Sequence, residues 1–473
     1  MGRDLSYAGV MGRRNDIMLK AVGIDYRSYA TGVLAFDYEA LMREAGDIAE
    51  VRRIQRETHV GDTPLWELGN ITRLVRALAP PGKGARVFLK DEAANPSGSF
   101  KARRAALSVY HAARKGYPGV SAATSGNYGA AVASQAAMRR VGCIIIQEVF
   151  DSRGIGQPEI VEKGRACEAY GAEVVQLTVG PELFYVFLVT LEETGYFNAS
   201  LYTPYSVAGI ETLGYELAEQ MVAREGRPPD VVVVTHAGGG NVTGTARGLR
   251  KAGATAAQVV GVSVDLTGLH MASDRDFNRK SFTTGHTGFG IPFATWPDRA
   301  DVPRNAARSL RYLDRLVLVT QGEVFYVTEL LAQLEGLERG PAGNTSLAAA
   351  IVLAQELDRD KIVVVQETEY TGAGKHPWAQ LTFSRRNGIA VERGDPAGNA
   401  PGRRIVLPRD PEQLRVKEFP LDNVRRSYLR NALNQAGDRR LLPEDYRFLA
   451  DDTRLDEDRV RSFLKEVAAS EAN

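Results

Sequence analysis

The sequence predicts an α/β protein built on two open parallel sheets with helices on both faces. Short apolar or β-branched runs alternate with helical patterns along most of the chain, and such alternation is typical of parallel sheets. Three of these runs end in turns rich in glycine, serine or asparagine that lead into a helix. Open α/β sheets bind ligands at the carboxyl ends of their strands, so these turns are predicted to form a functional site.

Length and composition narrow the class of protein. The 473 residues are enough for two or three domains with a large buried core. The formal net charge of +1 gives no case for nucleic acid as a partner. No apolar run approaches the roughly 20 residues of a membrane span, and no signal peptide is evident, so we expect a cytoplasmic protein without membrane contact. Cys143 and Cys167 are expected to be small buried residues in a reducing compartment rather than a disulfide.

The chain divides into four expected units. Residues 1–60 form a helical N-terminal extension, with helices predicted at 17–22 and 38–51. A large domain is expected from residues 61–118 and 195–380, interrupted by a small α/β domain at 119–194. Residues 381–473 form a C-terminal extension, with a short strand at 404–407 and helices at 423–436 and 456–468.

Each predicted strand is a short apolar or β-branched run bounded by turn residues. In the small domain, strands at 120–123, 143–147 and 173–177 alternate with helices at 130–139, 158–170 and 181–194. In the large domain the strands are at 86–89, 231–234, 259–264, 316–319 and 362–365. Residues 266–305 are polar and glycine-rich, and we expect a mobile loop or an active-site cover there.

The first turn of chemical interest places Lys101 at the start of a helix predicted at 102–113. Ser97 or Ser99 is a plausible N-cap, because a hydroxyl there can accept free backbone N–H groups. The positive helix terminus and desolvation would both lower the pKa of Lys101, which would make it a nucleophile able to form a Schiff base. The alternative is a surface lysine that begins an exposed helix.

Two further turns of the same kind follow later strands. Strand 120–123 leads into Thr124-Ser125-Gly126-Asn127-Tyr128-Gly129, and strand 231–234 leads into Thr235-His236-Ala237-Gly238-Gly239-Gly240-Asn241. Consecutive glycines let the backbone come close to an anion, which the next helix terminus favours. One glycine run is weak by itself. The three motifs in this order, each at a strand-to-helix turn, are much more specific.

With these motifs, the chain resembles the fold-type II pyridoxal-phosphate enzymes, a group that includes threonine synthase, cysteine synthase and tryptophan synthase β. The matching stretches lie at 61–65, 90–101, 124–129, 238–241 and 371–374. The resemblance implies pyridoxal 5'-phosphate as cofactor, and no metal site is expected. Many relatives carry aspartate directly after the lysine, where this chain has Ala102.

The resemblance also implies roles for individual residues. Lys101 would hold the cofactor as a Schiff base and act as the base at the substrate Cα. Asn127 would hydrogen-bond the phenolic oxygen of the cofactor, and Thr371 would face the pyridine nitrogen. A helix-capping amide and a turn threonine remain the structural alternatives for these two. The phosphate would be cradled by Gly238, Gly239, Gly240 and Asn241, and the substrate carboxylate by Ser125, Gly126 and Tyr128.

Within the group, the tracts 21–26, 91–101, 171–177 and 196–204 resemble the thiolase branch, whose large subunits act on 2-amino-4-oxopentanoate. This implies cleavage with coenzyme A to acetyl-CoA and alanine, in ornithine degradation. It also implies a small second subunit and homodimerisation, with a heterotetramer as one arrangement. One alternative is a threonine synthase-like lyase that eliminates or replaces a β- or γ-substituent. A cofactor-binding but non-catalytic subunit is the alternative from another class.

Overall fold

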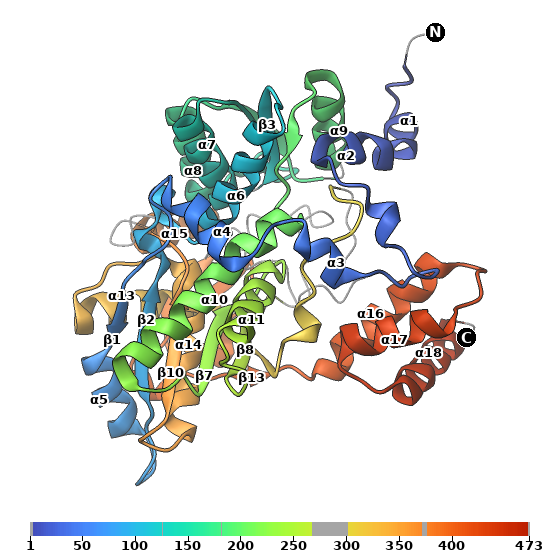
Figure 1. Ribbon diagram of the computed structural model, residues 1–473. Helices are drawn as coiled ribbons and strands as arrows, with labels where there is room; N and C mark the ends of the chain where they lie inside the picture. The colour runs from blue at the N-terminus through green and yellow to red at the C-terminus, as the bar shows by residue number, and fades with distance from the viewer. Residues whose placement is uncertain (1–2, 125, 181, 267–300, 371–375, 472–473) are drawn as a thin grey trace.

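The computed structural model describes residues 3–124, 126–180, 182–266, 301–370 and 376–471. Two sheets of mostly parallel strands are each covered by helices, and the C-terminal residues form a separate helical group (Figure 1). The predicted α/β class, with open parallel sheets between helices, is confirmed.

The larger sheet has seven strands, of which the central five are parallel. The short edge strands β1 and β13 pair antiparallel with their neighbours and cover the open edges of the sheet. In spatial order the strands are β1 (Leu65–Glu67), β2 (Arg86–Asp91), β10 (Ile362–Glu367), β7 (Val231–Thr235), β8 (Gln258–Val264), β9 (Arg315–Val319) and β13 (Lys417–Glu418).

Alternate residues of the central strands face opposite helix layers. In β7, Val231 and Val233 pack in one apolar cluster, whereas Val232 and Val234 pack in another. This follows from the two-residue period of a strand, and burial on both faces explains the uninterrupted valine run. One layer contains α5 (Gly69–Leu78), α13 (Gln321–Glu335) and α14 (Pro341–Glu356), and the other contains α10 (Pro204–Glu225) and α11 (Gly240–Lys251).

The smaller sheet has four parallel strands, and its two faces bury different helices. Ile145 packs in one cluster with α7, and Ile146 packs in another with α9 and the N-terminal helices. The strands are β5 (Glu173–Thr178), β4 (Gly142–Phe150), β3 (Gly119–Thr124) and β6 (Phe197–Asn198). The helices are α6 (Lys101–Arg114), α7 (Asn127–Arg139), α8 (Pro158–Ala169) and α9 (Glu182–Thr194). Cys143 and Cys167 are free and buried, as predicted.

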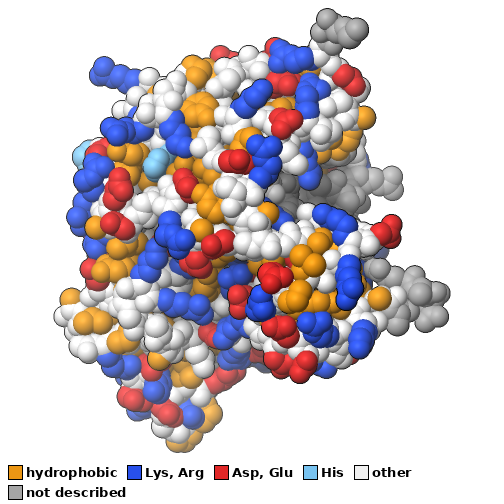
Figure 2. Space-filling view, turned by 45° about the vertical axis from the view of Figure 1, so that its right-hand side comes forward, with side chains coloured by type: hydrophobic (Ala, Val, Ile, Leu, Met, Phe, Trp, Pro, Cys, Tyr) orange, Lys and Arg blue, Asp and Glu red, His pale blue; other side chains and the backbone are white. Residues whose placement is uncertain are grey.

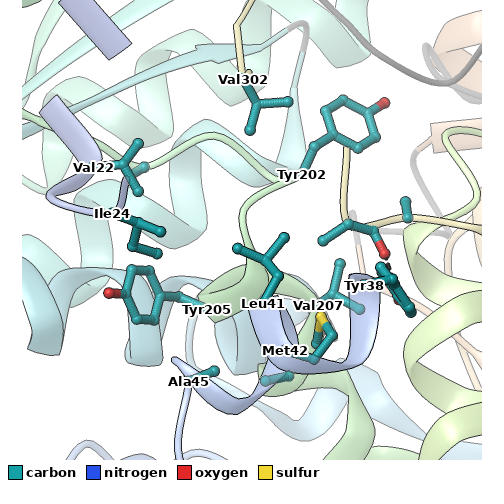
Figure 3. Close-up of a cluster of buried hydrophobic side chains, with 14 of the residues drawn as sticks. Val22, Ile24, Tyr38, Leu41, Met42, Ala45, Tyr202, Tyr205, Val207 and Val302 are labelled. Atoms are coloured by element: carbon teal, nitrogen blue, oxygen red, sulfur yellow. Dashed lines mark hydrogen bonds between the residues drawn. The ribbon is translucent and has the colours of Figure 1, made fainter. Parts of the chain in front are cut away.

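The N-terminal extension packs on the body of the protein. Its elements are α1 (Tyr7–Gly12), α2 (Arg14–Val22), η1 (Tyr26–Tyr29), α3 (Tyr38–Arg43) and α4 (Ile48–Arg56). The prediction of one helix at 38–51 is wrong. Gly46 has a positive φ of 87°, and the Asp47 side chain then caps α4 by accepting the N–H of Glu50 at 2.8 Å. Figure 3 shows Leu41 and Met42 of α3 lying against Tyr205 and Val207 of α10.

The C-terminal extension has two parts. The first contains α15 (His376–Arg386) and a two-stranded parallel sheet of β11 (Ala390–Arg393) and β12 (Arg404–Leu407), which packs on α13. The second contains α16 (Leu421–Ala436), α17 (Pro443–Thr453) and α18 (Glu457–Glu471). The strand and the two predicted helices are present, and α17 was not predicted. Asp445 of α17 accepts the backbone N–H groups of Leu34 and Ala35 at 2.7 and 2.8 Å, so the two extensions clasp each other.

The surface carries charges of both signs. Figure 2 shows Lys and Arg side chains interspersed with Asp and Glu over the visible face, in keeping with the net charge of +1. None of the helices in the described ranges is both long enough and apolar enough to cross a membrane.

Candidate active site

Lys101 is the first residue of α6, at the end of a turn that is fixed to the large sheet. After β2 the chain forms the short helices η2 (Glu92–Ala94) and η3 (Pro96–Gly98). The backbone N–H of Phe100 donates to the carbonyl of Thr368 at 3.0 Å, and that of Tyr370 donates to the carbonyl of Gly98 at 2.7 Å. The lysine turn is therefore held against the segment that follows β10.

The cap predicted for this helix is wrong. Phe100 occupies the N-cap position of α6 and makes no side-chain cap hydrogen bond. Ser97 instead has a φ of 63° inside η3, and Ser99 is extended and bridges to Glu369. The serines shape the turn before the helix and leave the first N–H groups of α6 without a hydroxyl cap.

The ε-amino group of Lys101 is poised to lose its proton near neutrality. Burial, together with the nearby positive charge of Arg104, lowers its pKa to about 7. Glu369 and Glu159 act in the opposite direction. The pKa depression expected from the sequence is therefore present, with burial as its main cause. A neutral amine can act as nucleophile or base.

Four buried charged side chains support this turn from behind. Arg103 donates to both oxygens of Glu92, at 2.7 and 2.8 Å. Glu216 of α10 accepts from Arg103, from Lys90 of β2 and from the backbone N–H groups of residues 62 and 63. The charges of the four side chains sum to zero. We call Lys90, Glu92, Arg103 and Glu216 the buried charge cluster; it ties β2, α6 and α10 together.

Asn127 begins α7, beside the lysine turn. It is buried, with 5% of its surface exposed, and α7 contacts η3. The preceding Gly126 donates its N–H to the hydroxyl of Thr124 at 3.0 Å. Tyr128 donates its hydroxyl to the carbonyl of Ala199 at 2.6 Å, so its side chain points into the core. Among the residues predicted to bind the substrate carboxylate, Ser125 lies outside the described residues.

The glycine turn between β7 and α11 forms a cradle that any side chain would fill. A Cβ atom at Gly239 would lie 2.7 Å from the hydroxyl oxygen of Ser309, and one at Gly240 would lie 2.7 Å from the guanidinium of Arg104. Gly239 also has a positive φ of 77°. Only glycine therefore fits at the start of α11, where Ser309 and Arg104 lie close to the backbone. The first N–H groups of a helix favour an anion.

Two buried side chains at this cradle have polar atoms without a hydrogen-bond partner. Asn241, 7% exposed, has no hydrogen bond at either atom of its side-chain amide. Arg104, 4% exposed, has none at Nε. Unpaired buried polar atoms are costly and normally mark a place where a ligand or water completes the site. The glycines and these side chains fit a phosphate group.

The far side of the site lies at the end of β10. Thr371, predicted to face the cofactor's pyridine nitrogen, lies outside the described residues. Four residues before it, Glu367 is fully buried, with no hydrogen bond at either carboxyl oxygen. Burial, reinforced by the charges of Glu369 and Asp91, raises the pKa of Glu367 well above its usual value.

Sequence reasoning missed several residues of this site. Arg104 could have been found, because it follows Lys101 by one helical turn and so shares its face of α6. Ser309 lies against Gly239, and the Tyr202 hydroxyl lies against Gly238. Both residues come from distant segments that no local pattern connects to the glycine turn. Glu159, in the first turn of α8, is 2% exposed. Burial raises its pKa to about 7, against the opposing charges of Lys163 and Lys101.

Comparisons with known proteins bear on this geometry. A family model described as pyridoxal-phosphate dependent enzyme matches residues 56–368. A 2-amino-4-ketopentanoate thiolase beta subunit from an unknown prokaryotic organism is 66% identical over 99% of both chains. The protein of that name from Acetoanaerobium sticklandii is 62% identical over 99% of this chain and 100% of its own. A solved pyridoxal 5'-phosphate-dependent aspartate racemase shares the fold, with a TM-score of 0.56 at 20% identity over 70% of this chain and 98% of that one.

Proposed function

Since the chain belongs to the pyridoxal-phosphate dependent enzymes, we propose that it is the large catalytic subunit of a 2-amino-4-oxopentanoate thiolase. The observation that carries this proposal is identity over the whole chain. Residues 56–368 are common to the family, whereas the 66% and 62% identities extend over 468 residues and include both extensions. Because the extensions clasp each other and pack on the core, they belong to the same functional unit.

In the proposed reaction the thiol of coenzyme A attacks C4 of the substrate. The C3–C4 bond breaks, the acetyl group leaves as acetyl-CoA, and C3 gains a proton to give alanine. The bound cofactor supplies an electron sink that stabilises negative charge next to the substrate Cα. Lys101 would hold the cofactor and, once released from it, take the proton from Cα. With a pKa of about 7, much of this lysine is neutral at physiological pH.

The high pKa values of the two cysteines favour a reaction in which coenzyme A, not the protein, supplies the thiol. Burial raises the pKa of both Cys143 and Cys167 to about 12, so neither supplies a thiolate near neutrality. Thiolysis by coenzyme A needs no protein thiol. At the glycine turn, the phosphate of the cofactor would be held by Gly238, Gly239, Gly240 and Asn241.

Substrate contacts are proposed at the start of α7. Asn127 would orient the ring of the cofactor, and the backbone of Ser125, Gly126 and Tyr128 would hold the substrate carboxylate. Thr371 would face the pyridine nitrogen. Because both relatives are named beta subunits, we also propose a smaller second subunit, together with homodimerisation of this chain.

A titration of the purified, cofactor-loaded chain with amino acids tests the proposal. Product-like alanine, as the D or L enantiomer, should shift the visible absorbance of the bound cofactor and should exchange its Cα proton for solvent deuterium, followed by NMR. O-phosphohomoserine and serine should be inert. Lys101→Ala should abolish the exchange, whereas Lys115→Ala, at the other end of α6, should retain it. Consumption of O-phosphohomoserine or serine with alanine ignored would instead indicate a threonine synthase-like lyase.

A further inference from the structure

The guanidinium of Arg104 lies against the first residue of α11. A Cβ atom at Gly240 would be 2.7 Å from each of its two terminal nitrogens and 3.1 Å from its central carbon. The side chain is 4% exposed, and its guanidinium carbon lies 5.4 Å from the centre of the Phe100 ring. Arg104 therefore reaches from α6 across to the glycine turn.

The hydrogen bonding of this arginine is incomplete. Nη1 donates to the carbonyl of Leu201 at 2.9 Å, and Nε has no partner. Within the described ranges no carboxylate forms an ion pair with it; Tyr128 and Tyr202 are the groups that raise its pKa. By contrast, the adjacent Arg103 is paired with two carboxylates. An unpaired buried charge is costly, so the site calls for an anion.

The location of the Arg104 guanidinium, at the N-terminus of α11, is a second reason to expect an anion here. Burial lowers the pKa of Arg104 to about 10, so the group still carries its charge at pH 7. That charge faces the N-terminus of α11, where the helix dipole is also positive and repels it. Only an anion between the two relieves both. The free N–H groups of the glycine turn and the unpartnered amide of Asn241 point to the same ligand.

We propose that Arg104 binds the phosphate of the cofactor and adds a full positive charge to the backbone cradle. In pyridoxal phosphate the aldehyde and the phosphate-bearing arm stand on neighbouring ring positions. Residues three apart on a helix are also neighbours, so Lys101 and Arg104 on one face of α6 match the two groups. A single helix would then hold the cofactor at both its aldehyde and its phosphate.

Binding of two cofactor forms to the apo chain tests this. Pyridoxal lacks the phosphate but keeps the aldehyde, so the ratio of its Kd to that of pyridoxal phosphate isolates the phosphate contact. Arg104→Gln should raise the Kd of pyridoxal phosphate by about 10- to 100-fold, the loss expected for a charged hydrogen-bonded contact. The Kd of pyridoxal should change less than about 3-fold, because pyridoxal has no phosphate for Arg104 to contact. Arg114→Gln, at the exposed end of α6, should change neither.

Several outcomes would overturn the proposal. Equal loss of both ligands would indicate general damage to the site, and an unchanged ratio would show that the guanidinium does not meet the phosphate. Weaker alanine binding with unchanged cofactor affinity would place Arg104 at the substrate carboxylate instead. If the glutamine variant does not fold, the same two Kd values are measured with Arg104→Lys. It keeps the charge but loses the planar fork, and it should shift the ratio in the same direction by a smaller factor.

The result is independent of the proposed thiolysis. Both titrations use the apo chain without substrate, so a negative outcome leaves the reaction assignment untouched. A second signature comes from stability, measured by thermal unfolding. Because the substitution removes an unpaired buried charge, apo Arg104→Gln should melt no lower than the apo wild type, while saturating pyridoxal phosphate should stabilise it less. An apo variant that melts well below wild type, with the affinity ratio unaltered, would contradict the proposal.

Discussion

Replacing Glu216 by glutamine removes one negative charge from the buried charge cluster. In the native protein its carboxylate accepts the N–H groups of Asp62 and Thr63, both at 2.9 Å, and the side chains of Lys90 and Arg103. An amide keeps one acceptor oxygen but turns an NH₂ donor towards these donors. The cluster then carries one uncompensated positive charge in a region where Arg103 and Lys90 have no exposed surface.

The expected cost is large. Breaking a buried ion pair by removing one partner destabilises a protein by about 3–5 kcal/mol. Although burial works the other way, the charges of Arg103 and Lys90 hold the pKa of Glu216 well below its usual value of 4.5. The carboxylate therefore stabilises the fold fully above pH 4.5, and its contribution is lost as the pH falls further. The gap between variant and wild type should narrow in acid.

Equilibrium unfolding in urea measures this effect. Tryptophan fluorescence reports the unfolding, and one of the three tryptophans, Trp66, lies beside the cluster, where its indole N–H donates to Asp91 at 3.3 Å. Glu219→Gln is the matched control. Glu219 follows Glu216 by one turn of α10 and pairs with Arg52 at 2.8 Å, but it is 45% exposed, so we expect less than about 1 kcal/mol. A Glu216→Gln protein as stable as this control would refute the reasoning.

Three further predictions follow from the site and the core. Amine-specific labelling of Lys101 in the apo chain, read by peptide mass spectrometry, should rise through pH 7 and then level off, since its pKa is about 7; a rise that continues towards pH 10.5 would contradict the burial argument. Cys143 and Cys167 should both stay unreactive to a thiol reagent at pH 8 until the protein is denatured, because burial raises both pKa values to about 12; rapid labelling of the native chain would oppose this. Gly240→Ala should weaken cofactor binding by about 10-fold or more, because the methyl group occupies space next to the guanidinium; Gly69→Ala, with open space around it, should bind as wild type.

The local elements were predictable because strong local signals specify them. The valine run at 231–234 is buried on both faces, and the break between this strand and α11 follows its glycines. The start of α6 at Lys101 was also close to the prediction. The predictions failed where the end of a helix depends on the backbone conformation of a single residue. The stripe of apolar residues at 38–51 continues through Gly46, but a positive φ there ends the helix geometry.

Only part of the site could be predicted from the sequence, for a different reason. The lysine, asparagine and glycine motifs are each contiguous in sequence, so the three could be recognised together by their order along the chain. Ser309 and Tyr202 reach the same cradle from other parts of the chain, and Glu367 gains its importance from burial that the sequence does not display. Arg104 was within reach, since helical spacing alone puts it beside Lys101.

The clasp between the two extensions has a consequence for how the protein is made. Asp445 and its partners Leu34 and Ala35 are separated by 411 and 410 residues. During synthesis the N-terminal segment emerges from the ribosome early and must wait for nearly the whole chain before its carboxylate partner exists. Until then its backbone N–H groups and the apolar side chains beside them depend on water or on chaperones. A nascent chain stalled before α17 would therefore present this segment to proteases, even if both sheets had already formed.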